Sequence, residues 1–133
     1  MQRRILVYGH GDKDSLQTAE DIQEYIAKDI FAEDYNRRYR YTQRKEAHVI
    51  VLSWEGKAYG HFEVQAMEEP TAEDREEYPR VRQVYIIRES ARYGNPVPLS
   101  ALGITRIQFG KCISEEQFSE IETLAGTVTK YSQ

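Results

Sequence analysis

Two short stretches of the sequence hold the residues best suited to binding a ligand. Residues 8–12 read Tyr-Gly-His-Gly-Asp; two glycines let a ligand approach the backbone closely, although Asp12 is equally suited to closing a turn before a helix. Residues 37–45 read RRYRYTQRK, with five basic side chains and no acid. Tyrosine rings between basic side chains are typical of a surface that stacks on bases and contacts phosphates.

The basic stretch at residues 37–45 has an acidic counterpart. Residues 63–77 hold seven acidic side chains and one arginine, so the net charge of −4 conceals a separation of charge along the chain. The basic stretch is therefore either a phosphate-binding surface or a solvated face that pairs with the acidic residues. We expect phosphate contact, because five bases with no acid are more one-sided than solvated faces usually are.

The other reactive residue types form no catalytic or metal-binding pattern. His10, His48 and His61 lack the spacing of metal ligands, and Cys112, the single cysteine, can form no internal disulfide. No phosphate-binding glycine loop, Ser-His-Asp set or catalytic carboxylate pair can be argued from the sequence. We therefore predict a protein that is not an enzyme and needs neither a metal nor a cofactor.

Length and composition indicate one globular domain over residues 1–133, with 40% hydrophobic and 30% charged residues. The longest apolar run, residues 49–52, is far too short to cross a membrane. No apolar segment of signal-peptide length follows Arg3 and Arg4. We therefore expect no membrane association and a location in a reducing cytoplasm.

Strands and helices must position these residues. Residues 4–8 are a short apolar strand bounded by glycine, and residues 16–34 repeat apolar side chains at the helical period. Strands at 48–54 and 59–64 are separated by residues 55–58, a spacing that suits a hairpin.

Turn and cap signals predict the rest of the chain. Two prolines mark residues 68–79 as an acidic loop, and the prolines of residues 94–98 break regular structure. A capping box at residues 114–117 opens a helix to about residue 124, with Gly126 as its stop. The remaining predicted segments are an irregular stretch at 34–45, a strand at 81–88, a helical turn at 99–102 and a short strand at 105–109. This order favours a small, mostly antiparallel sheet curled on itself with helices outside.

Four segments, taken in their order and spacing, resemble the PUA-like superfamily, and within it EVE-type domains and their restriction-associated relatives. The segments are VIVLSW at 49–54, YGHFEV at 59–64, PVPL at 96–99 and ISEEQF at 113–118. The resemblance implies an α+β fold, a PUA-like curled, mostly antiparallel β-barrel with flanking helices. It also implies a concave pocket that takes a flipped, often modified base from DNA or RNA. The sequence leaves open whether the chain works alone or beside a nuclease or motor protein.

Such a pocket needs flat rings to sandwich the base, polar groups to read its edge and basic side chains for the flanking phosphates. The sequence offers candidates for each role, although each aromatic residue among them is also suited to the core of a barrel. The ring candidates are Tyr8, Trp54, Tyr59 and Tyr85; the edge-reading candidates are Gly9, His10, Gly11, Asp12, Ser15 and Asn36; the phosphate-binding candidates are Arg37, Arg38 and Arg40.

A second function, from another class, is compatible with the same fold. A non-enzymatic regulatory module would hold a small molecule or a protein tail, and the acidic residues 68–77 favour it because they repel phosphate or attract a basic partner. One arrangement separates the two hypotheses. If the arginines of residues 37–44 ring the same concave face as Trp54, nucleic-acid binding gains support; if they lie opposite to it, the regulatory module gains support.

Overall fold

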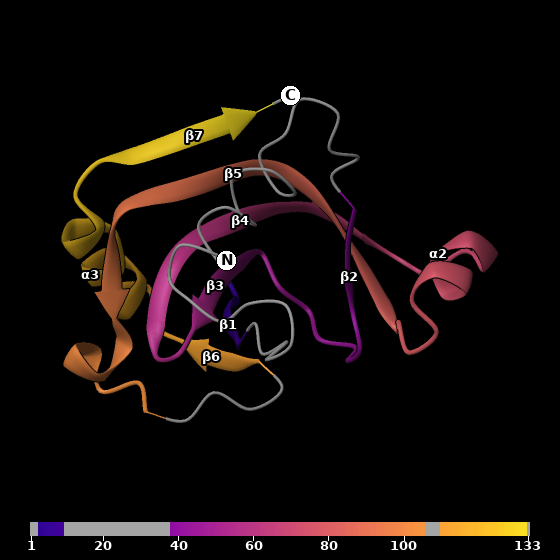
Figure 1. Ribbon diagram of the computed structural model, residues 1–133, viewed down its shortest axis with the longest axis horizontal. Coiled ribbons are helices and arrows are strands. Elements are labelled where there is room, and N and C mark those ends of the chain that lie inside the picture. The colour runs from indigo at the N-terminus through magenta and orange to yellow at the C-terminus, as the bar shows by residue number, and fades with distance from the viewer. Residues whose placement is uncertain (1–2, 10–37, 106–109, 133) are drawn as a thin grey trace.

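The computed structural model describes residues 3–9, 38–105 and 110–132, which form one curled sheet with two helices and a 3-10 turn (Figure 1). The strands are β1 (Ile5–Gly9), β2 (Arg38–Tyr41), β3 (Val49–Trp54), β4 (Lys57–Glu68), β5 (Gln83–Pro98), β6 (Lys111–Ile113) and β7 (Val128–Ser132). The helices are α2 (Ala72–Glu77) and α3 (Glu115–Ala125), and the 3-10 turn is η2 (Leu99–Leu102).

The sheet runs in the order β2-β5-β4-β3-β1-β6, with β7 also paired to β5. Strands β1 and β3 are parallel, and the other paired strands are antiparallel. The long strands β4 and β5 arch over β3 and β1, so the sheet closes to about half a barrel (Figure 1). Helix α3 lies at one end of the arch, and α2 lies outside the sheet beside β2 (Figure 1).

Two hydrophobic clusters fill the two faces of the sheet. Because side chains alternate along a strand, Ile5 and Val7 of β1 join a cluster with α3, whereas Leu6 and Tyr8 join the opposite cluster. The Tyr8 ring stacks on the Tyr41 ring of β2 with centroids 3.8 Å apart, although β5, β4 and β3 lie between their strands in the sheet. Only the inside of a curled sheet brings such distant strands together, so this second cluster occupies the concave face.

The predicted hairpin is present with a tighter turn. Strands β3 and β4 are joined by Glu55 and Gly56 alone, both with positive φ, at 47° and 77°. Two central residues of positive φ form the turn whose twist matches a β-hairpin, and glycine adopts this conformation without strain. Strand β4 therefore begins at Lys57, and it continues to Glu68 through several bulges.

Three segments predicted to be irregular are regular in the structure. The stretch at 34–45 contains strand β2, and the loop at 68–79 contains α2, which begins with a capping box between Thr71 and Asp74. The break at 94–98 is the end of β5, which pairs with β4 as far as Pro98. Since β7 pairs with β5 only over Glu89–Tyr93, the two prolines lie where the strand needs fewer N–H donors.

Other predictions are confirmed in the described residues. The first strand, the hairpin strands, the turn η2 and helix α3 lie where the sequence places them, and Ser114 and Gln117 form the expected capping box. The strand predicted at 81–88 is the first part of β5, and strands β6 and β7 were not predicted. The predicted helix at 16–34 and residues 106–109 of the predicted strand lie outside the described residues.

The sheet and helices confirm the coarse fold class, a curled and mostly antiparallel α+β arrangement. Among the described residues, no helix has the length and apolar character needed to cross a membrane.

Candidate functional site

Four tyrosines meet on the concave face, and we call Tyr8, Tyr39, Tyr41 and Tyr85 the tyrosine cluster. The Tyr85 hydroxyl donates to the backbone carbonyl of Lys45 at 2.5 Å and lies 2.7 Å from the Tyr8 hydroxyl. Since Tyr85 has a single proton to donate, the Tyr8 hydroxyl is the donor to Tyr85. The polar atoms of these two residues are therefore satisfied inside the protein.

The tyrosine cluster is also shielded from solvent and closely packed. Tyr8 and Tyr85 are fully buried, and burial raises the pKa of each phenol, so both stay protonated at neutral pH. Gly110, at φ +83°, packs against the Tyr8 ring so closely that an added Cβ would lie 2.3 Å from Cε1. Only Tyr41 reaches the edge of the cluster, where it is half-buried.

Trp54 and Tyr59 pack in the same core at the hairpin end of the sheet. Trp54 is 8% exposed, and its ring lies 6.5 Å from that of Tyr59 between centroids. Together with Tyr8 and Tyr85, they therefore occupy the core position that the sequence left open as the alternative to ligand binding. All four predicted ring residues are therefore buried, and Trp54, at 8%, is the most exposed of them.

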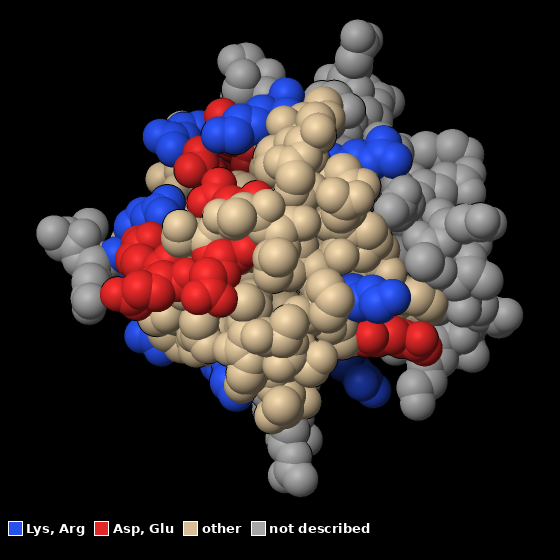
Figure 2. Space-filling view, turned by 90° about the vertical axis from the view of Figure 1, so that its left-hand side faces the viewer, with Lys and Arg blue, Asp and Glu red and all other residues tan. Residues whose placement is uncertain are grey.

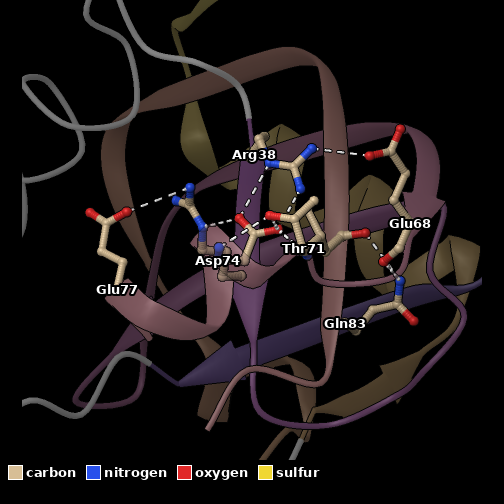
Figure 3. A network of polar contacts seen from close by, with 8 residues as sticks. Arg38, Glu68, Thr71, Asp74, Glu77 and Gln83 are labelled. Atoms are coloured by element: carbon tan, nitrogen blue, oxygen red, sulfur yellow. Dashed lines mark hydrogen bonds and ion pairs between the residues drawn. The ribbon is translucent and has the colours of Figure 1, made fainter. Parts of the chain in front are cut away.

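Two arginines of the basic stretch face the other side of the sheet. Arg38 and Arg40 alternate along β2 with Tyr39 and Tyr41, so they point to the convex face and away from the tyrosine cluster. There they meet Asp74 of α2, which is buried and not part of a solvated loop (Figure 3). Arg38 and Arg40 thus lie on the face opposite Trp54, the arrangement that favours the regulatory module.

Asp74 holds both arginines through its two carboxylate oxygens. Arg38 Nη2 lies 2.6 Å from Oδ2 and Arg40 Nε lies 2.8 Å from Oδ1. The Thr71 backbone N–H also donates to Oδ2, at 2.8 Å (Figure 3). These donors, Arg38 first, keep the pKa of Asp74 far below its usual range against the opposing effect of burial. We call Arg38, Arg40, Thr71 and Asp74 the Asp74 network.

Acidic residues pair with Arg44 and provide a second partner for Arg38. Arg38 pairs with Glu68 at 3.0 Å in addition to Asp74, and Arg44 pairs with Glu69. Lys45 instead donates its ammonium to the carbonyl of Gly110 at 3.1 Å. The described arginines of the stretch are therefore paired as expected for a solvated face that pairs with the acidic residues.

A pocket of about 320 Å³ opens where β2 ends and α2 turns back toward β5. Its wall is formed by residues 40–42 and 77–81, which the Asp74 network holds side by side. This volume is at the lower end of the range for small-molecule sites. The pocket brings Tyr41, at the edge of the tyrosine cluster, close to the exposed Tyr78.

Charge and ring contacts give the pocket a mixed chemistry. The Arg40 guanidinium lies over the Tyr78 ring, 5.1 Å from its centroid, and Arg40 Nη2 lies 3.8 Å from a Glu77 carboxylate oxygen. Arg80 lines the pocket, and among the described residues no ion pair engages its guanidinium. The pocket can therefore offer ring faces, a fixed cation, an available cation and a carboxylate to one ligand.

The α3 side of the molecule offers no comparable combination. Helix α3 carries four acidic residues, namely Glu115, Glu116, Glu120 and Glu122. In Figure 2, acidic side chains form a patch at one border of this face, with Lys and Arg side chains beside them, and its middle is uncharged. Glu115 is paired with Arg3 at 2.8 Å.

The structure describes few of the predicted edge-reading residues. Gly9 ends β1, where it pairs with Ser53 of β3. The others, and one phosphate-binding candidate, lie outside the described residues: His10, Gly11, Asp12, Ser15, Asn36 and Arg37.

The sequence contained two signals that point to the pocket. Thr71 followed three residues later by Asp74 is a helix-start pattern, and it would have replaced the acidic loop by α2. Tyr78-Pro79-Arg80 directly after that helix places an aromatic ring and a cation in a turn.

Within residues 3–9, 38–105 and 110–132, no three His, Cys, Asp or Glu side chains are arranged to hold a metal ion. Comparisons of the chain with protein-family models, with curated proteins and with solved structures found no match.

Proposed function

We propose that this protein is a nucleic-acid-binding module of the PUA-like, EVE-type kind, and that the pocket between β2 and α2 holds an unpaired base. One observation carries the proposal: Tyr41, Tyr78 and Arg40 meet in a single pocket of about 320 Å³. Bases outside a duplex are bound by stacking on aromatic rings and guanidinium groups. The sequence suggested the same chemistry but attributed it to rings that are buried.

Basic groups near the pocket suit the phosphates on either side of such a base. Arg80 lines the pocket, and the Arg82 backbone N–H donates to the Tyr41 carbonyl at 2.9 Å, so Arg82 stands next to the pocket wall. Both side chains are exposed. Among the described residues, neither guanidinium has an ion pair, unlike those of Arg40 and Arg44.

The test is fluorescence anisotropy with labelled single-stranded and duplex DNA and RNA, titrated between about 50 and about 200 mM salt. We expect single strands to bind more tightly than duplexes, with affinity that falls as salt rises. Tyr78→Ala is expected to weaken binding about 5- to 150-fold, the loss of one base–aromatic stack. Arg80→Ala is expected to weaken it and to reduce the salt slope by about one.

Lys57→Ala is the matched control for charge. Lys57 is an exposed cation at the start of β4, paired with Pro98 at the end of the sheet next to η2, far from α2 (Figure 1). Its removal changes the net charge as Arg80→Ala does but should leave affinity unchanged. Absence of binding at low salt, or equal losses in Lys57→Ala and Arg80→Ala, would contradict the proposal.

The second candidate function is a regulatory module that holds a small molecule or a protein tail. The pairing of Arg38, Arg40 and Arg44 with acidic residues favours it, because paired cations attract phosphate less. Under this function, Tyr78→Ala would abolish binding of a small aromatic ligand, while oligonucleotides would not bind at any salt concentration. Oligonucleotide length separates the two, since affinity for a nucleic acid rises with the number of phosphates contacted.

A further inference from the structure

We propose that Glu77 reads the edge of the base in the pocket and that the site selects guanine. The inference rests on the proposed nucleic-acid-binding function and deepens it. Its starting point is an oddity of the pocket: a carboxylate lines a site whose ligand would carry phosphates. A carboxylate next to a phosphate is repulsive, so it is compatible with the ligand only where it meets hydrogen-bond donors of the base.

Glu77 is paired with Arg40, but within the described residues its carboxylate accepts no hydrogen bond. Its carboxylate lies 3.8 Å from Arg40 Nη2, which is an ion pair but longer than a hydrogen bond, and its side chain is 59% exposed. Among the described residues, no hydrogen bond to this carboxylate is present. Both of its oxygens are therefore available to accept from a ligand.

The orientation of Glu77 depends on the Asp74 network. Arg40 donates its Nε to Asp74 at 2.8 Å, and Asp74 is 1% exposed, so the guanidinium is anchored from inside. The other end of the same guanidinium faces Glu77 (Figure 3). The cation over the Tyr78 ring and the carboxylate beside it are thus positioned by one buried aspartate.

Among the common bases, guanine matches two free carboxylate oxygens best. Its N1–H and N2–H₂ groups are adjacent donors on the Watson–Crick edge, so they can donate to both oxygens at once. Adenine and cytosine each offer one amino donor beside an acceptor nitrogen, and uracil offers one N–H between two carbonyls. Carboxylate side chains read donor groups of bases in this way. The order of affinity follows as guanine, then adenine and cytosine, then uracil.

The experiment uses short labelled single strands of one length that differ in a single central base. We expect the guanine strand to bind about 5- to 150-fold more tightly than the uracil strand, the usual discrimination of a bidentate contact. Replacing guanine by hypoxanthine, which lacks the N2 amino group, should lose part of that preference. Replacing it by 7-deazaguanine should lose none, because N7 is on the other edge.

Glu77→Gln tests the residue, and Glu76→Gln is its matched control. Both variants remove one negative charge from α2, but Glu76 does not line the pocket. We expect Glu77→Gln to bring the four strands to similar affinity, since an amide offers only one acceptor, and Glu76→Gln to keep the guanine preference. Equal binding of all four strands by the unmodified protein would overturn the guanine proposal and leave nucleic-acid binding standing. Failure to bind any strand would overturn the proposed function itself.

Discussion

Strand β2 presents tyrosines to one face of the sheet and arginines to the other. The polar groups on the two faces are satisfied in different ways, by neutral hydrogen bonds on one and by ion pairs on the other. On the concave face, the hydroxyl groups of Tyr8 and Tyr85 are hydrogen-bonded to each other and to one backbone carbonyl, and no charged group takes part in these hydrogen bonds. On the convex face, Asp74 is satisfied by two cations that keep partial contact with water. The aromatic residues are therefore structural on the closed face, and the pocket forms where the two faces meet at the end of β2.

The largest effect is expected from removing an aromatic core residue. Trp54→Ala should lower the free energy of unfolding by about 3–5 kcal/mol, because it removes a large buried ring and leaves a cavity. Tyr78→Ala, which removes a ring that is 48% exposed, should cost about 1 kcal/mol or less. Denaturant unfolding of both variants measures the difference. A Trp54→Ala protein of unchanged stability that loses oligonucleotide binding would return the ligand site to the concave face.

Breaking the Asp74 network is expected to cost less, on the order of 3 kcal/mol. Asp74→Asn leaves two partly buried arginines without their anion and weakens the cap of α2. The loss of unfolding free energy is at the lower end of the range for buried ion pairs, because both arginines keep contact with water. Glu73→Gln, an exposed acid in the same turn, is the control and should change stability by about 0.5 kcal/mol at most.

Acid titration sharpens the same comparison. The folded-state pKa of Asp74 is depressed, so its contribution is fully present above the ordinary pKa of about 4 and is lost as pH falls further. The stability difference between the parent and Asp74→Asn should therefore be constant from pH 7 to about pH 4 and shrink below it. A difference that already shrinks at pH 6 would contradict this assignment.

A buried histidine on the α3 side gives the next effect. His61 is 3% exposed, its Nδ1 lies 2.7 Å from the Tyr93 hydroxyl, and burial lowers its pKa to about 4. Because the unfolded state binds the proton more tightly, stability should be complete above about pH 6.5 and fall by up to about 3 kcal/mol as pH drops to about 4. His61→Gln should flatten this dependence between those pH values, which denaturant unfolding at a series of pH values measures.

The smallest expected effect comes from two glycine substitutions, which together distinguish a steric clash from backbone strain. Gly110 and Gly103 have similar positive φ values of 83° and 75°, but an added Cβ would strike Tyr8 only at Gly110. Gly110→Ala should therefore be less stable than Gly103→Ala by about 1–3 kcal/mol, the usual cost of overpacking. Thermal unfolding of the two variants measures it, and equal melting temperatures would mean that the concave core is looser than the contact implies.

Local signals predicted the parts of the fold that local physics decides. Ser114 and Gln117 cap α3 through contacts within four residues, and the glycine at 56 sets the hairpin turn. Strands β2, β6 and β7 were missed because each is stabilised by pairing with a distant strand rather than by its own pattern. Propensity is weak information wherever a distant neighbour supplies the hydrogen bonds.

The candidate site was predicted in its chemistry but not in its place. The alternation of Arg38, Tyr39, Arg40 and Tyr41 was visible as a mixture of rings and cations, yet only a strand sorts it into two faces. The burial of Asp74 was not visible, because its partners lie more than thirty residues away. The sequence placed Tyr78 in a loop. Its place in the pocket depends on Arg40 and Tyr41 of β2, which lie far from it in the sequence.

The position of β1 within the sheet also determines how the chain can fold. β1 pairs with β3 on one side and with β6 on the other, so Ile5 contacts both Val49 and Ile113. By contrast, β3, β4 and β5 follow one another closely along the chain and pair as neighbours. Bringing β1 together with partners that lie far along the chain costs conformational entropy before any contact offsets it. During synthesis, the meander of β3, β4 and β5 can therefore form early, whereas one edge of β1 stays unpaired until β6, which follows the meander along the chain, has been made.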